Sequence, residues 1–185
     1  MSVIVTVPHA ACPHQSDPRR CDRVSEQVAR MLVGVLEQQS CQTILHINDS
    51  VQRSVVDMNR KVSRTTEWRK QLRALFETEQ IVYHIDVHSF ISDDSKRRQV
   101  LVYALHEWGT KSLETVKLMK ALTPRGELRY PIYRGGENDI HREALLEYKI
   151  PSVLLEFNET AEDAELGKVT QTLGEWICER IKPTD

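Results

Sequence analysis

Three polar residues alternate with apolar ones in the segment His84-Ile-Asp86-Val-His88. Side chains along a strand point alternately to opposite faces, so in a strand these three polar groups would share one face. Burying them is costly without partners, and a metal ion supported by hydrogen bonds would satisfy them. The spacing therefore favours His88 as a metal ligand supported by Asp86. A structural His–Asp pair at a strand end is the alternative.

Glu156 lies inside the largely apolar run 151–157. A buried glutamate is rare unless it is paired, and burial raises the pKa of a carboxylate. A raised pKa suits a general base that takes a proton from a metal-bound water and passes it to a leaving amine. We therefore expect Glu156 to be catalytic. The alternative is a glutamate that forms a salt bridge or caps a helix at a strand exit.

Two other segments place polar residues directly after apolar ones. His9 follows the apolar run 3–7 and could bind a metal, or it could simply bond to a backbone carbonyl. Asp57 could orient a metal-bound imidazole. Arg60 could hold a substrate carboxylate through two parallel hydrogen bonds. A surface salt bridge is the alternative for the arginine.

The elements that would position these residues alternate along the chain. Short apolar runs predict strands, and apolar residues at helical spacing predict helices. Strands that alternate with helices indicate an α/β domain with a largely parallel, buried sheet. The expected strands are 3–7, 43–47, 81–88, 100–105 and 151–157, and the expected helices are 22–38, 64–77, 111–122, 139–148 and 161–181.

In open α/β sheets, ligands bind beyond the carboxyl ends of the strands. His9 follows the first expected strand, His88 closes the third, and Glu156 lies at the end of the last. The three residues are therefore expected to meet at one edge of the sheet.

Length, composition and charge indicate what kind of protein this chain forms. The chain has 185 residues, 40% hydrophobic and 28% charged, which suits one compact domain over 1–185. A formal net charge of −2 gives no reason to expect nucleic acid or an anionic membrane as a partner. The apolar N-terminal run is too short for a signal peptide, and no run approaches the roughly 20 apolar residues of a membrane helix. We therefore expect a cytoplasmic protein.

Four cysteines are present, at positions 12, 21, 41 and 178, and they form no C-x-x-C pair. In a reducing compartment they are expected to be free thiols. Cys12 and Cys21 follow His9, so a thiolate ligand to the metal is a further possibility.

The order of the polar segments resembles a known family. The shared features are a histidine after the first strand, Asp-x-Asn-Arg at 57–60, Asp-x-His-Ser at 86–89 and a late strand that ends in Glu. They resemble the zinc-dependent N-formylglutamate amidohydrolases and their wider relatives, the zinc carboxypeptidases and the zinc N-acetylmuramoyl-L-alanine amidases. The resemblance spans nearly the whole chain. It implies a single three-layer domain of the phosphorylase/hydrolase-like type, with a mostly parallel mixed sheet between helices.

This resemblance implies that His9 and His88 bind one zinc ion and that Asp57 supports the first histidine. The third ligand departs from a clean pattern. The carboxypeptidases use His-x-x-Glu, but Cys12 stands where that glutamate would be. The muramoyl amidases place an acidic ligand at the start of the first helix, a position that Asp22 fits. Asp22 has an alternative role as a residue that the helix dipole favours. Its rivals as ligand are His14, Asp17 and Glu26.

The same resemblance implies an enzyme that cuts amide bonds. Glu156 matches the catalytic glutamate, while Asn59 and Arg60 match the pair that holds a substrate carboxylate. An N-acyl amino acid or the C-terminal end of a short peptide would fit. Arg134 and Asn138 flank a Gly-Gly loop that could line the pocket, since glycine permits close backbone approach.

Two other functions remain open from the sequence. One is a non-catalytic carboxylate- or peptide-binding module on the same scaffold, and the other is an amidase acting on cell-wall peptides. Histidine and carboxylate ligands would also accept iron or manganese in place of zinc.

Overall fold

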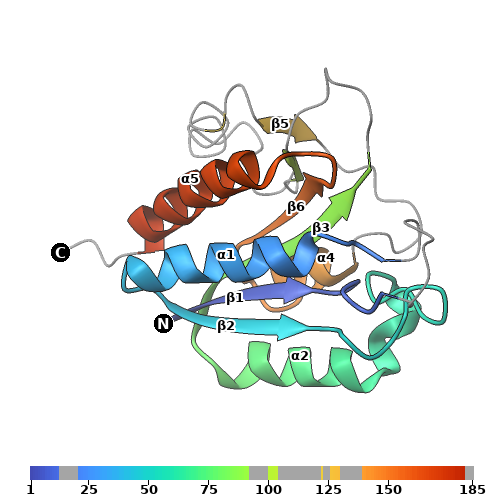
Figure 1. Ribbon diagram of the computed structural model, residues 1–185. Helices are drawn as coiled ribbons and strands as arrows, with labels where there is room; N and C mark the ends of the chain where they lie inside the picture. Colours follow the sequence, from blue (N-terminus) through green and yellow to red (C-terminus); the bar gives the residue numbers. More distant parts are fainter. Residues whose placement is uncertain (13–20, 92–99, 104–121, 123–125, 130–138, 182–185) are drawn as a thin grey trace.

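The computed structural model describes residues 1–12, 21–91, 100–103, 122, 126–129 and 139–181 (Figure 1). A six-stranded sheet in the order β2-β1-β3-β6-β4-β5 forms its centre. Neighbouring strands are parallel except for β4 and β6, which are antiparallel. The strands are β1 Ser2–Val7, β2 Gln42–Ile47, β3 Ile81–Phe90, β4 Val100–Tyr103, β5 Gly126–Arg129 and β6 Ser152–Asn158.

Helices cover both faces of this sheet (Figure 1). The helical elements are α1 Ser25–Gln38, the 3-10 helix η1 Lys61–Thr65, α2 Glu67–Thr78, α4 Asp139–Leu146 and α5 Asp163–Ile181. Val3, Val5 and Val7 of β1 pack in one core with α1 and α5, whereas Ile4 packs in a second core with α2 and α4. This alternation follows from the period-2 geometry of a strand. The predicted three-layer α/β fold with a mostly parallel mixed sheet is confirmed.

Helices α1 and α5 approach each other closely at Gly174. A Cβ atom added at Gly174 would meet Val35 Cγ1 and lie 3.0 Å from Val35 Cβ. Gly34 differs, because a Cβ atom added there would meet nothing within 4 Å. Gly174 is thus required by packing, while Gly34 is not.

Most predicted elements are present with shifted ends. The first helix begins at Ser25 rather than at residue 22, and the second begins at Glu67 because η1 occupies the residues before it. Strand β5 was not predicted, since its four residues follow shortly after Pro124 and begin with glycine, which strands disfavour. The predicted helix 111–122 lies outside the described residues except for its last position.

The expectation of free cysteine thiols is wrong. Cys12 is bonded to Cys21, and Cys41 is bonded to Cys178. The packing of α5 on α1 brings Cys178 near Cys41 across 137 residues of chain, which local sequence does not reveal. Cys12 therefore offers no thiolate to a metal. Disulfides are rare in cytosolic proteins, so these bonds give no support to a cytoplasmic location.

Among the helices that the structure describes, none combines the length and the hydrophobicity that a membrane span requires.

Candidate metal centre and active site

Three side chains that could bind a metal converge at the carboxyl end of the central strands. His9 follows β1, Asp22 lies just before α1, and His88 belongs to β3. One nitrogen or oxygen atom from each lies within 4.8 Å of the other two. All three residues are at most 3% exposed. The structure thus brings together the three residues predicted as ligands.

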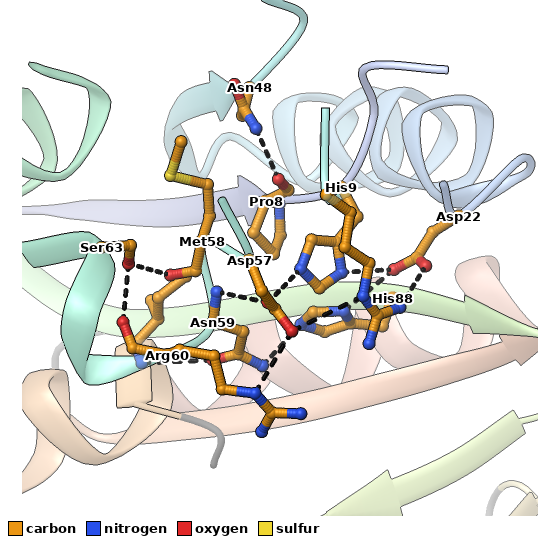
Figure 2. Close-up of polar contacts among 12 residues, drawn as sticks. Pro8, His9, Asp22, Asn48, Asp57, Met58, Asn59, Arg60, Ser63 and His88 are labelled. Carbon is orange, nitrogen blue, oxygen red and sulfur yellow. Dashed lines mark hydrogen bonds and ion pairs between the residues drawn. The ribbon is translucent and has the colours of Figure 1, made fainter. Parts of the chain in front are cut away.

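Both histidines direct one ring nitrogen toward Asp22 (Figure 2). Asp22 Oδ2 lies 3.2 Å from His9 Nδ1 and 2.9 Å from His88 Nδ1. The other ring nitrogen of each histidine faces a second carboxylate. His9 Nε2 lies 2.7 Å from Asp57 Oδ1, and His88 Nε2 lies 3.2 Å from Asp86 Oδ2.

The charges of this cluster are strongly coupled. Burial alone would raise the pKa of Asp22, but hydrogen bonds from His88 and His9 hold it well below its usual range. Burial also opposes a charged His88, yet Asp86 and Asp22 raise its pKa well above the ordinary value. The cluster therefore holds buried carboxylates that require positive charge between them.

The donor set fits a catalytic metal ion. Two imidazole nitrogens and one carboxylate are the ligands that open, water-binding zinc sites use. A metal-binding histidine usually donates its other ring N–H to a carboxylate, the place that Asp57 and Asp86 occupy here. The residues present thus fit a metal ion such as zinc, which His9, Asp22 and His88 would hold.

Sheet register brings Glu156 to this cluster. Strands β3 and β6 are parallel neighbours, and Glu156 is paired with His88. Paired residues of adjacent strands share a face of the sheet. Burial raises the pKa of Glu156 to about 7, although the nearby positive charge of His88 opposes this. A carboxylate with this pKa is suited to accepting and returning a proton near neutral pH.

A buried arginine, Arg69, fixes the backbone of the segment 57–60. Arg69, which is fully buried, donates to Met58 O at 2.8 Å and to Asp139 Oδ2 at 2.8 Å, and also binds Glu143. Ser63 Oγ donates to the same Met58 carbonyl at 2.8 Å (Figure 2). These bonds fix the backbone that carries Asp57, so that its carboxylate faces His9.

Asn59 connects this segment to α4 and to His88. Its backbone oxygen accepts from Asp139 N at 3.2 Å, and its Oδ1 accepts from Ile140 N at 3.3 Å. Its Nδ2 lies 3.2 Å from His88 Nε2. Asn59 is only 5% exposed, so the geometry gives it a role in holding the first turn of α4.

Two arginines lie at the rim of the cluster. Arg60 Nε lies 3.2 Å from Asp57 Oδ2, and the Arg60 side chain is 36% exposed. Arg53 was not predicted, yet its Nη1 lies 3.4 Å from Asp22 Oδ1 and its Nε lies 3.6 Å from Asp57 Oδ2. Its only sequence signal is its position four residues before Asp57, which is common among surface ion pairs.

Glu26, the rival ligand that the structure describes, is not part of this cluster. Glu26 forms an ion pair with Arg30 on α1, 2.8 Å apart and partly exposed. Arg134 and Asn138, predicted to line the pocket, lie outside the described residues, as do His14 and Asp17.

Comparisons with known proteins give matches in structure and none in sequence. No family model matches the chain, and no curated protein matches it by sequence. Among solved structures, a gene product from Agrobacterium tumefaciens has a TM-score of 0.70 at 15% identity, over 96% of this chain and 87% of that one.

The similar structures also include named enzymes. An N-formylglutamate amidohydrolase from Ralstonia eutropha has a TM-score of 0.62 at 10% identity, over 96% of this chain and 94% of that one. The catalytic domain of the N-acetylmuramoyl-L-alanine amidase CwlV from Bacillus (Paenibacillus) polymyxa var. colistinus has a TM-score of 0.58 at 16% identity, over 97% of both chains. At these identities the matches establish a shared fold.

Proposed function

We propose that this chain is a single hydrolase domain, spanning 1–185, that cleaves amide bonds with the help of one zinc ion. The carrying observation is the convergence of His9, Asp22 and His88, with Glu156 paired to His88 across the sheet. The named structural neighbours include an N-formylglutamate amidohydrolase and a muramoyl amidase, which supports this class of reaction.

In the proposed mechanism, one carboxylate transfers a proton and two others orient the metal-binding histidines. When bound, zinc would acidify a water molecule and polarise the amide carbonyl. Glu156 would accept a proton from the attacking water and return it to the leaving amine, a role that its raised pKa suits. Asp57 and Asp86 keep the imidazole rings of His9 and His88 turned toward Asp22.

We propose an N-acyl amino acid or a short peptide with a free carboxylate as the substrate. Arg60 lies at the rim of the cluster with its guanidinium partly exposed, and it would bind that carboxylate. Arg53, which lies between Asp22 and Asp57, offsets the negative charge of the site.

Metal content tests the proposed site. Wild-type protein purified without added metal is expected to contain about one zinc per chain, or to bind one from buffer, and His88→Ala should lose it. His46→Ala is the matched control, because His46 is a histidine outside the cluster. Its Nε2 lies 3.0 Å from Trp68 O. A wild-type protein that neither contains nor binds zinc would exclude the proposed centre.

Turnover tests the proposed base. Against a panel of N-formyl and N-acetyl amino acids, Glu156→Gln should keep its zinc and lose at least about a hundredfold in kcat, the scale of general-base catalysis. Glu175→Gln is the control, since Glu175 contacts only Gln171 on exposed α5 surface among the described bonds. Unchanged kcat in Glu156→Gln would remove Glu156 from the mechanism.

The same assays separate the alternatives. A binding module would hold the carboxylate ligand, measured by calorimetry, without hydrolysing any member of the panel. A cell-wall amidase would release peptides from purified peptidoglycan and leave the small N-acyl amino acids intact.

A further inference from the structure

A continuous line of buried hydrogen bonds leads from Asp86 into the core. Thr6 Oγ1 lies 2.7 Å from Asp86 Oδ1 and 2.9 Å from His84 Nε2. Ser152 Oγ lies 2.7 Å from both His84 Nδ1 and His141 Nδ1. We call Thr6, His84, Ser152 and His141 the buried chain. Its members come from β1, β3, β6 and α4, and none is more than 8% exposed.

The direction of these bonds follows from counting protons. The Thr6 hydroxyl has one proton, which it donates to Asp86 at 2.7 Å rather than to Ile85 O at 3.5 Å. Thr6 Oγ1 therefore accepts from the Nε2–H of His84. A neutral imidazole with a proton on Nε2 has an acceptor at Nδ1, so Ser152 donates to His84.

The hydrogen bonds between Ser152 and His141, at the far end of the buried chain, run in the same direction. Because the Ser152 proton points to His84, its oxygen accepts from the Nδ1–H of His141. His141 Nε2 is then unprotonated, and among the described residues this buried atom has no hydrogen-bond partner. Burial lowers the pKa of His84 to about 4 and that of His141 to about 3, which is consistent with two neutral rings.

We propose that the buried chain is a positioning device for His88, an inference that rests on the proposed metal centre. By binding Asp86 Oδ1, it leaves Oδ2 facing His88 Nε2, 3.2 Å away. This carboxylate oxygen favours a proton on Nε2 over acceptance from the Asn59 amide Nδ2, which lies at the same distance. His88 Nδ1, which faces Asp22 at 2.9 Å, is then the atom that keeps its lone pair for the metal. The buried chain sets both the tautomer and the orientation of the ligand.

Its composition supports a role beyond packing. Four polar side chains are costly to bury, and apolar groups of the same shape in place of hydrogen-bonded partners can be nearly neutral or stabilising. Its members do not touch the three proposed ligands in any described bond, and Asp86 is the link between them. The supporting partners of metal-binding histidines typically change metal affinity 10- to 100-fold when they are removed.

The bond directions can be measured without any metal. Nitrogen-15 correlation spectra of the metal-free protein near pH 7 should show His84 protonated at Nε2 and His141 protonated at Nδ1, the less common tautomer in solution. The reverse tautomer at either ring would overturn the proposed direction.

Metal affinity tests the positioning role. In competition with a chromogenic chelator, Thr6→Val should bind zinc roughly 10- to 100-fold more weakly than wild type. Thr6→Ser, which keeps the hydroxyl, should stay close to wild type. Ser152→Ala interrupts the chain from another strand and should weaken binding in the same direction. Thr170→Val is the control, because it removes a buried hydroxyl that bonds only to α5 carbonyls among the described bonds.

The outcomes separate this inference from the proposed function. If wild type binds zinc and both Thr6→Val and Ser152→Ala, folded by circular dichroism, bind it equally well, the positioning role is wrong while the metal centre stands. If wild type binds no zinc, both proposals fail. Weaker binding in these variants, with Thr6→Ser and Thr170→Val unaffected, supports the inference.

Discussion

At the scale of single residues, the centre contains more acid than base. Asp22, Asp57 and Asp86 surround two imidazoles, and Glu156 is paired beside them. Buried carboxylates without compensating charge are costly. The excess of negative charge favours a cation between the histidines and Asp22. Arg53 and Arg60 at the rim of the cluster offset part of the remaining negative charge.

Arg60 can be separated from the rest of the site by changing the substrate. Arg60→Ala should raise KM roughly 10- to 100-fold for an N-acyl amino acid, because a hydrogen bond to a charged group is worth about 1.5–3 kcal/mol. The carboxamide of the same substrate lacks that charge, so its kcat/KM should change much less. Steady-state kinetics on both substrates checks this.

A matched control is Arg30→Ala, which removes an arginine paired with Glu26 on the exposed side of α1. Arg30→Ala should leave both substrates unaffected. Equal losses for the acid and the amide in Arg60→Ala would mean that Arg60 acts through Asp57 rather than on the substrate.

Much of the candidate site could be predicted from sequence for a physical reason. His88 and Glu156 interrupt apolar strands, where burying a polar group without a partner is costly. That contrast is visible in one sequence alone. Asp22 and Arg53 lie in polar surroundings, so nothing local distinguishes them. Asp22 was selected by resemblance, and Arg53 was missed, because only the fold brings it within 3.4 Å of Asp22.

At the scale of elements, helices α1 and α5 offer a sharp test of packing. Gly174→Ala should destabilise the protein by about 1–3 kcal/mol, the usual cost of overpacking, because the new methyl group meets the stiff side chain of Val35. Gly34→Ala, in the facing helix, should stabilise by up to about 1 kcal/mol, since alanine favours helix and the position is open. Urea unfolding measures both.

The two glycine variants act as controls for each other, because the same substitution is made in each partner of one helix pair. Destabilisation of similar size by both would contradict the close approach at Gly174. Gly167→Ala should fall between them, since its Cβ atom would lie at an ordinary 3.5 Å from Met31 Cε.

The elements were predictable where periodicity is strong. The apolar faces of α1 and α5 repeat at helical spacing, and the strands that flank the site are short apolar runs. The helix–helix approach and the disulfide between Cys41 and Cys178 were not predictable, because they depend on contacts between distant parts of the chain.

At the scale of the whole molecule, two buried neutral histidines make stability depend on pH. Burial lowers the pKa of His84 to about 4 and of His141 to about 3, against about 6.5 in an unfolded chain. The unfolded state therefore binds more protons below pH 6.5. The stability that these groups contribute is present above that pH and is lost progressively as the pH falls toward 4 and 3.

His141→Gln isolates one of these groups. In urea unfolding of the metal-free protein between pH 4.5 and 6, the free energy of unfolding of wild type should fall more steeply with acid than that of His141→Gln. The difference in slope should approach about 1.4 kcal/mol per pH unit, the value for one proton. Thr170→Val should keep the wild-type slope. Identical slopes for wild type and His141→Gln would show that His141 is already protonated in the folded protein.

The three proposed ligands come from separate parts of the chain, after β1, before α1 and within β3. An unfolded chain does not hold them together, so a metal that binds them binds the native state in preference. By mass action, each tenfold rise in free metal above the dissociation constant then adds about 1.4 kcal/mol to the free energy of unfolding. The supply of metal would thus govern how long the protein lasts as well as whether it works.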